Sequence, residues 1–181
     1  YLQIINMIIL FNKPFNVLCQ FTDREGRKTL SDFVKIKNVY AAGRLDFDSE
    51  GLVILTDDGK LQHLISDPEN KLEKTYWVQV EGIPSEESLN KLRKGILLKD
   101  GLTKPAKAKL IDRPKIMERI PPIRERKNIP TNWIELIITE GKNRQVRRMT
   151  AAIGHPTLRL IRYSIGDWNI DNIKPSEYRI V

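Results

Sequence analysis

Short apolar runs rich in branched and aromatic residues recur along this chain of 181 residues, and they require a fold with many strands. The predicted strands are Met7–Leu10, Val39–Ala42, Leu52–Thr56, Lys74–Val80, Ala106–Ile111, Trp133–Ile138, Thr157–Tyr163 and Tyr178–Val181. The chain is 40% apolar, which is enough to bury a core, and its length fits one domain or two closely packed halves.

Two segments between these runs carry the signals of helices. Residues Ser85–Leu97 begin at a potential capping serine followed by two glutamates, and they continue with an apolar stripe at helical spacing. Residues Asn143–Ile153 end at Gly154, with Pro156 just beyond, as helices commonly do. The second predicted helix carries arginines on one side and apolar residues on another, so it combines packing with charge.

The net charge of +8 is concentrated in the second part of the chain. Residues 1–70 carry 8 lysines and arginines against 10 acidic residues, whereas residues 71–181 carry 23 against 13. From Gly141 to Gly166 there are five arginines and one lysine but no acidic residue. Such a field indicates a polyphosphate partner, most simply a nucleic acid, because the planar arginine fork suits phosphate and base edges. A solvated basic face without a specific partner is the alternative.

The cysteine content and the opening of the chain predict a soluble, cytoplasmic protein. Cys19 is the single cysteine, so it forms no internal disulfide, and its apolar neighbours predict a buried thiol. The apolar opening Ile4–Phe11 is too short to cross a bilayer and lacks a basic leader. It is therefore predicted to be a strand, and no membrane partner is expected.

Residues 113–131 contain four prolines, six basic residues and two acidic residues. This composition predicts an insertion loop. Its basic side chains can grip a phosphate backbone, and a mobile, solvated loop is an equal alternative.

The stretch GRLDFDSEGLVILT places Arg44 and Asp46 two positions apart beside an apolar run. Residues two apart on a strand face the same side, so an extended segment would present these two side chains together. Spacing alone slightly favours the alternative, an acidic surface turn that contains Asp46, Asp48 and Glu50.

Metal and nucleotide motifs are not found in the sequence. The run Asp46–Asp57 comes close to a calcium-loop pattern, but it has glutamate at the fifth position, aspartate at the twelfth and predicted strands at its flanks. Two histidines and one cysteine make no zinc spacing, and there is no P-loop or dinucleotide fingerprint. We therefore expect no metal site.

Three longer segments carry a family resemblance: GRLDFDSEGLVILTDDG, KTYWVQVEG and EGKNRQVRRMTAAIGHPTLRLIRYSIGDW. Together with ILFNKPFNVLCQFTD and PPIRERKNIPTNW, they are similar in order and spacing to ribosomal pseudouridine synthases of the RsuA type, above all those that act on the large subunit. The resemblance covers nearly all of the chain. It implies an α+β catalytic fold, with a mixed, largely antiparallel sheet in two packed halves flanked by helices. Many relatives begin with a small S4 RNA-binding domain, which we do not expect here.

The resemblance also implies a reaction and its residues. Such enzymes break the bond between ribose C1' and uracil N1, rotate the base and join C1' to C5, without metal or cofactor. The catalytic aspartate falls on Asp46, the active-site tyrosine on Tyr76 and the aspartate-pairing arginine on Arg147. Arg44 matches an arginine that takes the space of the flipped base. A guanidinium beside Asp46 would hold it ionised, and Tyr76 offers a ring for stacking and a hydroxyl for proton transfer, although an ordinary strand aromatic is the alternative.

We accordingly predict site-specific conversion of uridine to pseudouridine in large-subunit (23S) ribosomal RNA, by one monomeric catalytic domain (residues 1–181) with two subdomains around an RNA-binding cleft. The target base must leave its stack, so the substrate is expected to be a stem-loop or a partly unfolded segment. The candidate RNA-binding residues are Arg44, Lys74, Lys142, Arg144, Arg148, Arg159 and Arg162. The alternatives are a synthase acting on transfer RNA, 16S ribosomal RNA or messenger RNA, and a non-catalytic assembly factor that binds ribosomal RNA.

Overall fold

The structure is a computed structural model that describes residues 6–181. Nine strands form one large sheet, and two short strands form a separate hairpin. The large sheet contains β1 (Ile8–Lys13), β2 (Tyr40–Ala42), β3 (Glu50–Thr56), β4 (Lys74–Glu81), β7 (Lys107–Ile111), β8 (Thr131–Ile138), β9 (Thr157–Ile165), β10 (Trp168–Asn169) and β11 (Tyr178–Ile180). The hairpin consists of β5 (Leu97–Leu98) and β6 (Gly101–Leu102).

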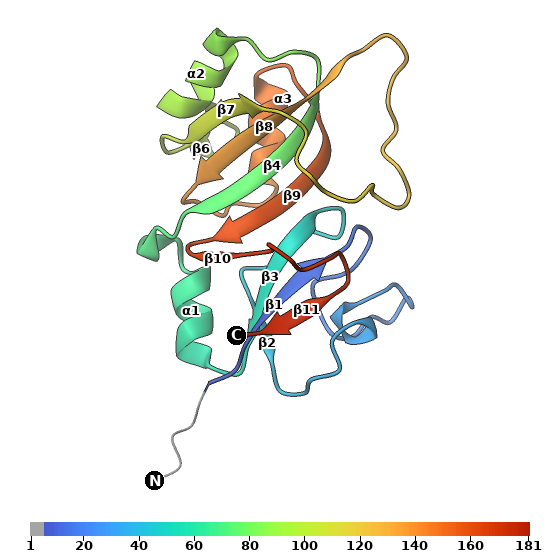
Figure 1. The fold of residues 1–181 in the computed structure, drawn as a ribbon. Coiled ribbons are helices and arrows are strands. Elements are labelled where there is room, and N and C mark those ends of the chain that lie inside the picture. Colours follow the sequence, from blue (N-terminus) through green and yellow to red (C-terminus); the bar gives the residue numbers. More distant parts are fainter. Residues whose placement is uncertain (1–5) are drawn as a thin grey trace.

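The large sheet has two halves that meet between β3 and β9 (Figure 1). The strand order is β11-β1-β3-β9-β4-β8-β7, with β2 paired to β3 and β10 paired to β9. Neighbouring strands are antiparallel except β3 and β9, which are parallel and share the residue pairs Glu50–Ile161 and Gly51–Arg162. This arrangement confirms the expected mixed, largely antiparallel sheet in two halves.

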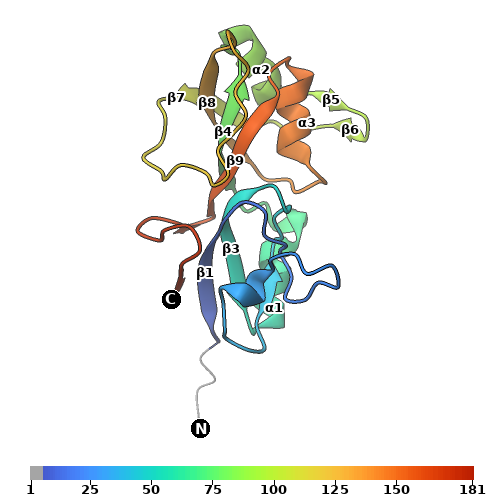
Figure 2. The same ribbon diagram turned by 90° about the vertical axis from the view of Figure 1, so that its right-hand side faces the viewer.

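Three α-helices lie on one side of the large sheet, as Figure 2 shows: α1 (Gly59–Ser66), α2 (Glu86–Lys94) and α3 (Gln145–Ala152). Apolar side chains of α2 and α3 pack on alternate residues of β4 and β8, and together they form a buried core that includes Tyr76. The next residue of β4, Trp77, points to the other side of the sheet, where its ring stacks on Tyr163 at 4.2 Å. The helices therefore cover the side of the sheet that carries Tyr76.

The predicted elements are present with shifted ends. All eight predicted strands form, and their ends are displaced by up to three residues. Helix α2 is shorter than predicted because Gly95 adopts φ +104 close to the carbonyl of Thr103, and α3 begins only after Arg144, whose φ is +51. The sequence patterns did not predict α1, the β5–β6 hairpin, β10 or the two short 3-10 helices Leu30–Asp32 and Pro68–Asn70.

Residues 112–130 contain no helix or strand, as expected for an insertion loop. Part of this loop is held against the molecule. Arg159 Nη2 donates to the carbonyl of Met117 at 3.0 Å, and the Arg119 guanidinium lies 4.0 Å from the ring centre of Phe15. Two arginines thus serve as anchors between the insertion and the folded core.

Two expectations about the first part of the chain can be compared with the structure. Cys19 is buried, as predicted. The predicted opening strand is present as β1, while residues 4 and 5 of the apolar opening lie outside the described residues. Within residues 6–181, no helix has both the length and the apolar character needed to cross a membrane.

Candidate active site

A cleft of about 450 Å³ lies between the two halves of the sheet, on the side that carries the helices. Its walls come from the β2–β3 connection, α1, β4, β9 and the segment that leads into α3. Such a volume is in the range of ligand-binding pockets. The predicted site residues that line it are Arg44, Asp46, Lys74, Tyr76, Lys142, Arg144 and Arg162.

The Asp46 side chain is carried by a tight turn between β2 and β3. β2 ends at Ala42, and Gly43 takes φ +74, a left-handed conformation that glycine adopts without strain. The carbonyl of Asp46 then accepts a hydrogen bond from Ser49 N at 3.1 Å, one residue before β3 begins. The extended segment expected around Arg44 therefore stops at Ala42, and a turn presents the carboxylate instead.

The buried side chain of Lys13 stabilises this turn. Its side chain is fully buried, and Nζ donates to the carbonyls of Pro14 at 3.0 Å, Val17 at 2.9 Å and Phe47 at 3.4 Å. Burial lowers the pKa of Lys13 to about 8, against the smaller opposing effect of Cys19 and the acidic residues nearby. The residue that follows Asp46 is thus fixed by a buried amine.

Two arginines of the α3 region reach the same turn. Arg144 Nη1 and Nη2 donate to the two carboxylate oxygens of Asp48 at 3.0 and 2.9 Å, and Arg144 Nη1 lies 3.5 Å from Asp46 Oδ2. Arg147 Nη2 donates to the carbonyl of Asp48 at 2.8 Å and lies 3.6 Å from its carboxylate. The hydrogen bond from Arg144 holds the pKa of Asp48 below its ordinary value, and burial lowers the pKa of Arg147.

These contacts differ from the expected pairing of Asp46 with Arg147. The arginine in contact with the Asp46 carboxylate is Arg144, while Arg147, one helical turn later, reaches the backbone and side chain of Asp48. Arg147 Nε is buried without a hydrogen-bond partner in the described structure. The sequence reasoning treated Asp48 as an ordinary turn residue and missed that it binds both arginines.

Tyr76 comes to the cleft from the other half of the sheet. It lies on β4, is 8% exposed, and packs against the aliphatic core under α2 and α3. Lys74, two residues earlier, faces the same cleft, as the alternation of a strand requires. The fold therefore brings Asp46 and Tyr76 into one cavity although they belong to different halves.

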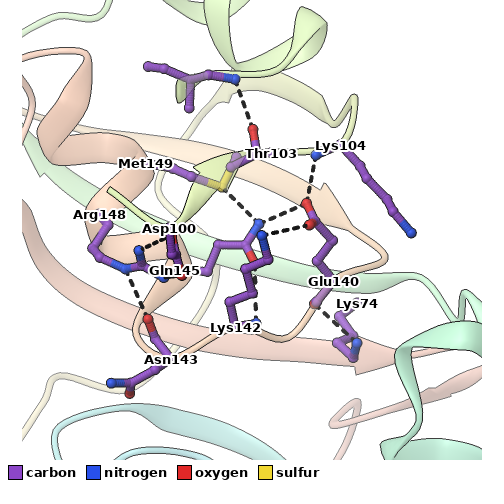
Figure 3. A network of polar contacts seen from close by, with 11 residues as sticks. Lys74, Asp100, Thr103, Lys104, Glu140, Lys142, Asn143, Gln145, Arg148 and Met149 are labelled. Atoms are coloured by element: carbon purple, nitrogen blue, oxygen red, sulfur yellow. Dashed lines mark hydrogen bonds and ion pairs between the residues drawn. The ribbon is translucent and has the colours of Figure 1, made fainter. Parts of the chain in front are cut away.

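A network around Glu140 fixes the entry to α3 (Figure 3). Glu140 is buried, and its Oε1 accepts hydrogen bonds from the backbone N of Lys104 at 2.7 Å and from Gln145 Nε2 at 3.1 Å. Its carbonyl accepts from Lys74 Nζ at 3.2 Å, and Lys142 N donates to Gln145 Oε1 at 3.2 Å. Burial is the main cause that lowers the pKa of Lys74, followed by the nearby charge of Arg162. The sequence analysis did not single out Glu140 and Gln145. The available signal was their position, since Glu140 precedes α3 and Gln145 is its first residue.

Two of the arginines expected to contact RNA have structural partners instead. Arg159 is 4% exposed and forms two 2.9 Å hydrogen bonds to the Glu50 carboxylate, which corrects both its expected RNA contact and the expected surface position of Glu50. Arg162 is also buried, and it donates to the carbonyls of Leu52 at 2.9 Å and Gly43 at 2.5 Å while lining the cleft. The two arginines are three residues apart on β9, so their side chains lie on opposite sides of the sheet, and each is covered by the residues packed there. A count of charges does not reveal this burial.

The remaining basic candidates lie nearer the surface. Arg148 pairs with Asp100 of the β5–β6 hairpin through contacts of 2.7 and 3.2 Å, outside the cleft lining. Lys142 lines the cleft with a partly exposed side chain, and Arg44 donates to Gln20 Oε1 at 3.3 Å. Of these three residues, Arg44 and Lys142 therefore contribute positive charge to the cleft.

Comparison with known proteins agrees with this architecture. Residues 7–152 match the family model of RNA pseudouridylate synthase. The chain is 59% identical over 172 residues to ribosomal large subunit pseudouridine synthase E of Vibrio parahaemolyticus, covering 95% of this chain and 72% of that protein. It is 56% identical over 172 residues to the protein of the same name from Xanthomonas axonopodis pv. citri, covering 93% of this chain and 90% of that protein.

A solved structure gives the same answer for the fold. A crystal structure of a pseudouridylate synthase superimposes with a TM-score of 0.79 and 32% sequence identity, covering 98% of this chain and 70% of that one. The matched region holds both halves of the sheet and the cleft between them. The chain therefore belongs to the RNA pseudouridylate synthase family and is an isomerase.

Proposed function

We propose that this enzyme converts a specific uridine of large-subunit (23S) ribosomal RNA to pseudouridine through Asp46, without a cofactor. Proteins that are 52–59% identical to it carry the name ribosomal large subunit pseudouridine synthase E, which supports this RNA over transfer RNA, 16S ribosomal RNA or messenger RNA. The observation that carries the chemistry is that Asp46 and Tyr76 line one cleft, with Arg144 3.5 Å from the Asp46 carboxylate.

Asp46 supplies the negative charge that cleavage of a glycosidic bond needs. An ionised carboxylate can attack the sugar C1' or the base C6, or stabilise positive charge developing on the sugar. Arg144, which lines the cleft, and Arg147, which binds the Asp48 carbonyl, place positive charge beside this carboxylate.

Tyr76 is the second proposed catalytic residue. Its ring forms part of the cleft wall, where a flat aromatic surface can stack on a flipped uracil. Its hydroxyl is the proposed carrier of the proton that leaves C5 when the new bond has formed. Arg147 acts in this proposal through the turn, because it binds the Asp48 carbonyl two residues from Asp46.

The proposed RNA contacts are the accessible basic side chains around the cleft opening, Arg44, Lys142 and Arg144. Arg44 would take the place of the base that leaves its stack in a stem-loop or a partly unfolded segment. A single chain supplies Asp46, Tyr76 and these basic side chains to the cleft, which supports a monomeric enzyme, and we place it in the cytoplasm with its ribosomal substrate.

The experiment that tests this function maps pseudouridine by carbodiimide primer extension in total RNA from cells with and without the gene. We expect one or a few pseudouridines to disappear from 23S ribosomal RNA and to return with the wild-type gene. If pseudouridine were lost only from transfer, 16S or messenger RNA, that RNA would be the substrate instead. If no RNA lost pseudouridine, the result would support an assembly factor.

Asp46→Asn tests the catalytic residue, and Asp112→Asn, at an exposed position of the insertion, is the matched control. We expect Asp46→Asn to bind the target RNA but to form no pseudouridine, whereas Asp112→Asn keeps wild-type activity. Activity of Asp46→Asn within tenfold of wild type would refute the role of Asp46.

A further inference from the structure

Asp48 occupies a central position between the catalytic turn and α3. Both of its carboxylate oxygens accept hydrogen bonds from Arg144, and its carbonyl accepts one from Arg147. By contrast, Asp46 has one contact to an arginine, at 3.5 Å through Oδ2. Within residues 6–181, Asp46 Oδ1 accepts no hydrogen bond.

Charge explains why Asp48 matters for Asp46. Arg144 lies close enough to Arg147 to disfavour the charge of Arg147, and the Asp48 carboxylate offsets this repulsion. The bidentate pair with Asp48 engages both terminal nitrogens of the Arg144 guanidinium, which limits how closely this guanidinium can bind Asp46. Without the Asp48 charge, Arg144 would be able to close on Asp46 as a two-oxygen pair and occupy the oxygens that must reach the substrate.

The backbone around Arg144 makes this restraint more necessary. Arg144 adopts φ +51 at the position before α3, and its side chain does not cap the helix. The side chain is 44% exposed, so little packing restricts its movement. The two hydrogen bonds to Asp48 are the contacts that fix where this guanidinium lies.

We propose that Asp48 is a positioning residue, which holds Arg144 and Arg147 so that Arg144 touches one oxygen of Asp46 and leaves the other for the substrate. The inference rests on the proposed function of Asp46. Asp48 itself does not touch the substrate in this scheme. Its effect on the reaction passes through the two arginines.

The principal test compares Asp48→Asn with Asp100→Asn in single-turnover assays on the target RNA. Asp100 is a matched control because it also accepts two hydrogen bonds from an arginine of α3, Arg148, but lies outside the cleft lining. We expect Asp48→Asn to lower the rate about 100-fold, the cost typical of a misplaced reacting group, with RNA affinity changed less than about threefold. Asp100→Asn is expected to keep the wild-type rate.

Two further readouts separate positioning from a merely structural effect. If Asp48 acts by restraining Arg144, adding Arg144→Gln to Asp48→Asn removes the misplaced guanidinium, and we expect the double variant to be faster than Asp48→Asn alone. The acidic limb of the pH–rate profile of Asp48→Asn should also move to lower pH, because Arg144 then pairs more closely with Asp46. The charged groups that face this turn are Lys13 of β1, Glu50 of β3, Arg119 of the insertion, and Arg144 and Arg147 of the α3 region.

The results that would overturn the proposal are distinct from those that would overturn the function. An Asp48→Asn rate within threefold of wild type, or a double variant slower than Asp48→Asn, would refute the positioning role while an inactive Asp46→Asn leaves the function intact. Thermal unfolding checks that each variant is folded. Asp48→Glu keeps the charge and is expected to react at least tenfold faster than Asp48→Asn. If Asp48→Asn does not fold, an Asp48→Glu rate below a thousandth of the wild-type rate would refute the proposal.

Discussion

The Arg159 guanidinium donates two hydrogen bonds of 2.9 Å to the Glu50 carboxylate, and both side chains are buried at the junction of the two halves of the sheet. Glu50 is the first residue of β3, directly after the turn that carries Asp46. Arg159 lies on β9, and the same strand carries Arg162, which lines the cleft. This ion pair, which lies outside the cleft lining, therefore joins the strand that follows the Asp46 turn to the strand that carries Arg162.

Breaking this buried pair should destabilise the fold strongly. We expect Glu50→Gln and Arg159→Met each to lower the free energy of unfolding by about 3–5 kcal/mol, because each leaves an uncompensated buried partner. The double variant Glu50→Leu/Arg159→Met should recover part of this loss. Urea unfolding measures the effect, and Glu86→Gln, which breaks an exposed pair with Arg93, should change stability by less than about 1 kcal/mol. Equal effects at the two pairs would show that burial of Glu50 and Arg159 is not decisive.

Gly51 permits the close approach of β3 to β9, and its replacement should be severe. A Cβ atom at this position would lie 2.2 Å from the carbonyl oxygen of Arg162, and the backbone φ of Gly51 is +108. We expect Gly51→Ala to lower stability by more than about 3 kcal/mol or to prevent folding, because backbone atoms on β9 must move. Gly59→Ala is the control, since no atom lies within 4 Å of its Cβ position in α1, and it should be neutral or slightly stabilising. Thermal denaturation of both variants decides this.

The buried amine of Lys13 should make stability depend on pH above neutrality. Its pKa is about 8 in the folded protein and 10.5 in the unfolded chain, so between these values the unfolded chain binds more protons. The stability of the wild type relative to Lys13→Met should therefore rise as the pH increases through this window, and the gain should be lost again as the pH falls through about 8. The full change is about 3 kcal/mol, since one pKa unit corresponds to about 1.4 kcal/mol. Urea unfolding at about pH 7 and about pH 10 measures it, and a pH-independent difference between the two proteins would contradict the assigned pKa.

Lys142 should contribute to RNA binding mainly through charge. It lines the cleft, its side chain is 39% exposed, and its ion pair with Glu140 is long, at 3.9 Å, so it can reach a phosphate. We expect Lys142→Ala to reduce the slope of log K against log salt by about 0.7–0.9, the value for one phosphate contact. Lys107→Ala, on the outer strand β7 beside Glu73, should leave the slope unchanged. Filter binding at several salt concentrations separates the two, and an unchanged slope for Lys142→Ala would place the RNA elsewhere.

Removing the Tyr76 hydroxyl should affect chemistry more than binding. Tyr76→Phe keeps the ring and its packing, so the protein should fold and bind RNA within about twofold of wild type while the single-turnover rate falls about 100-fold or more. Tyr163→Phe provides the control, because this ring stacks on Trp77 on the opposite side of the sheet. A near-normal rate for Tyr76→Phe would limit Tyr76 to stacking.

Local features of the sequence were sufficient to predict most of the secondary structure. The eight strands follow from apolar runs of strand length. Helices α2 and α3 follow from the helical spacing of their apolar residues and from the residues that mark helix ends. Helix α1 is missed because it begins in the run Asp57–Gly59, which resembles a turn. The motifs were also sufficient to nominate Asp46 and Tyr76, which the fold brings into one cleft.

The partners of the charged side chains were decided by tertiary structure alone. Arg144 contacts Asp46 and Asp48 almost a hundred residues away, and Glu50 meets Arg159 across the junction of β3 and β9. Composition describes these residues as an acidic turn and a basic surface, because a count of charges contains no information on which side chains face inward. Their pairing depends on the register of β3 against β9 and on the direction of α3, which arise when the whole sheet packs. The sequence by itself determined the strands and nominated Asp46 as the reacting carboxylate, and the packing of two distant segments determined which arginine lies beside it.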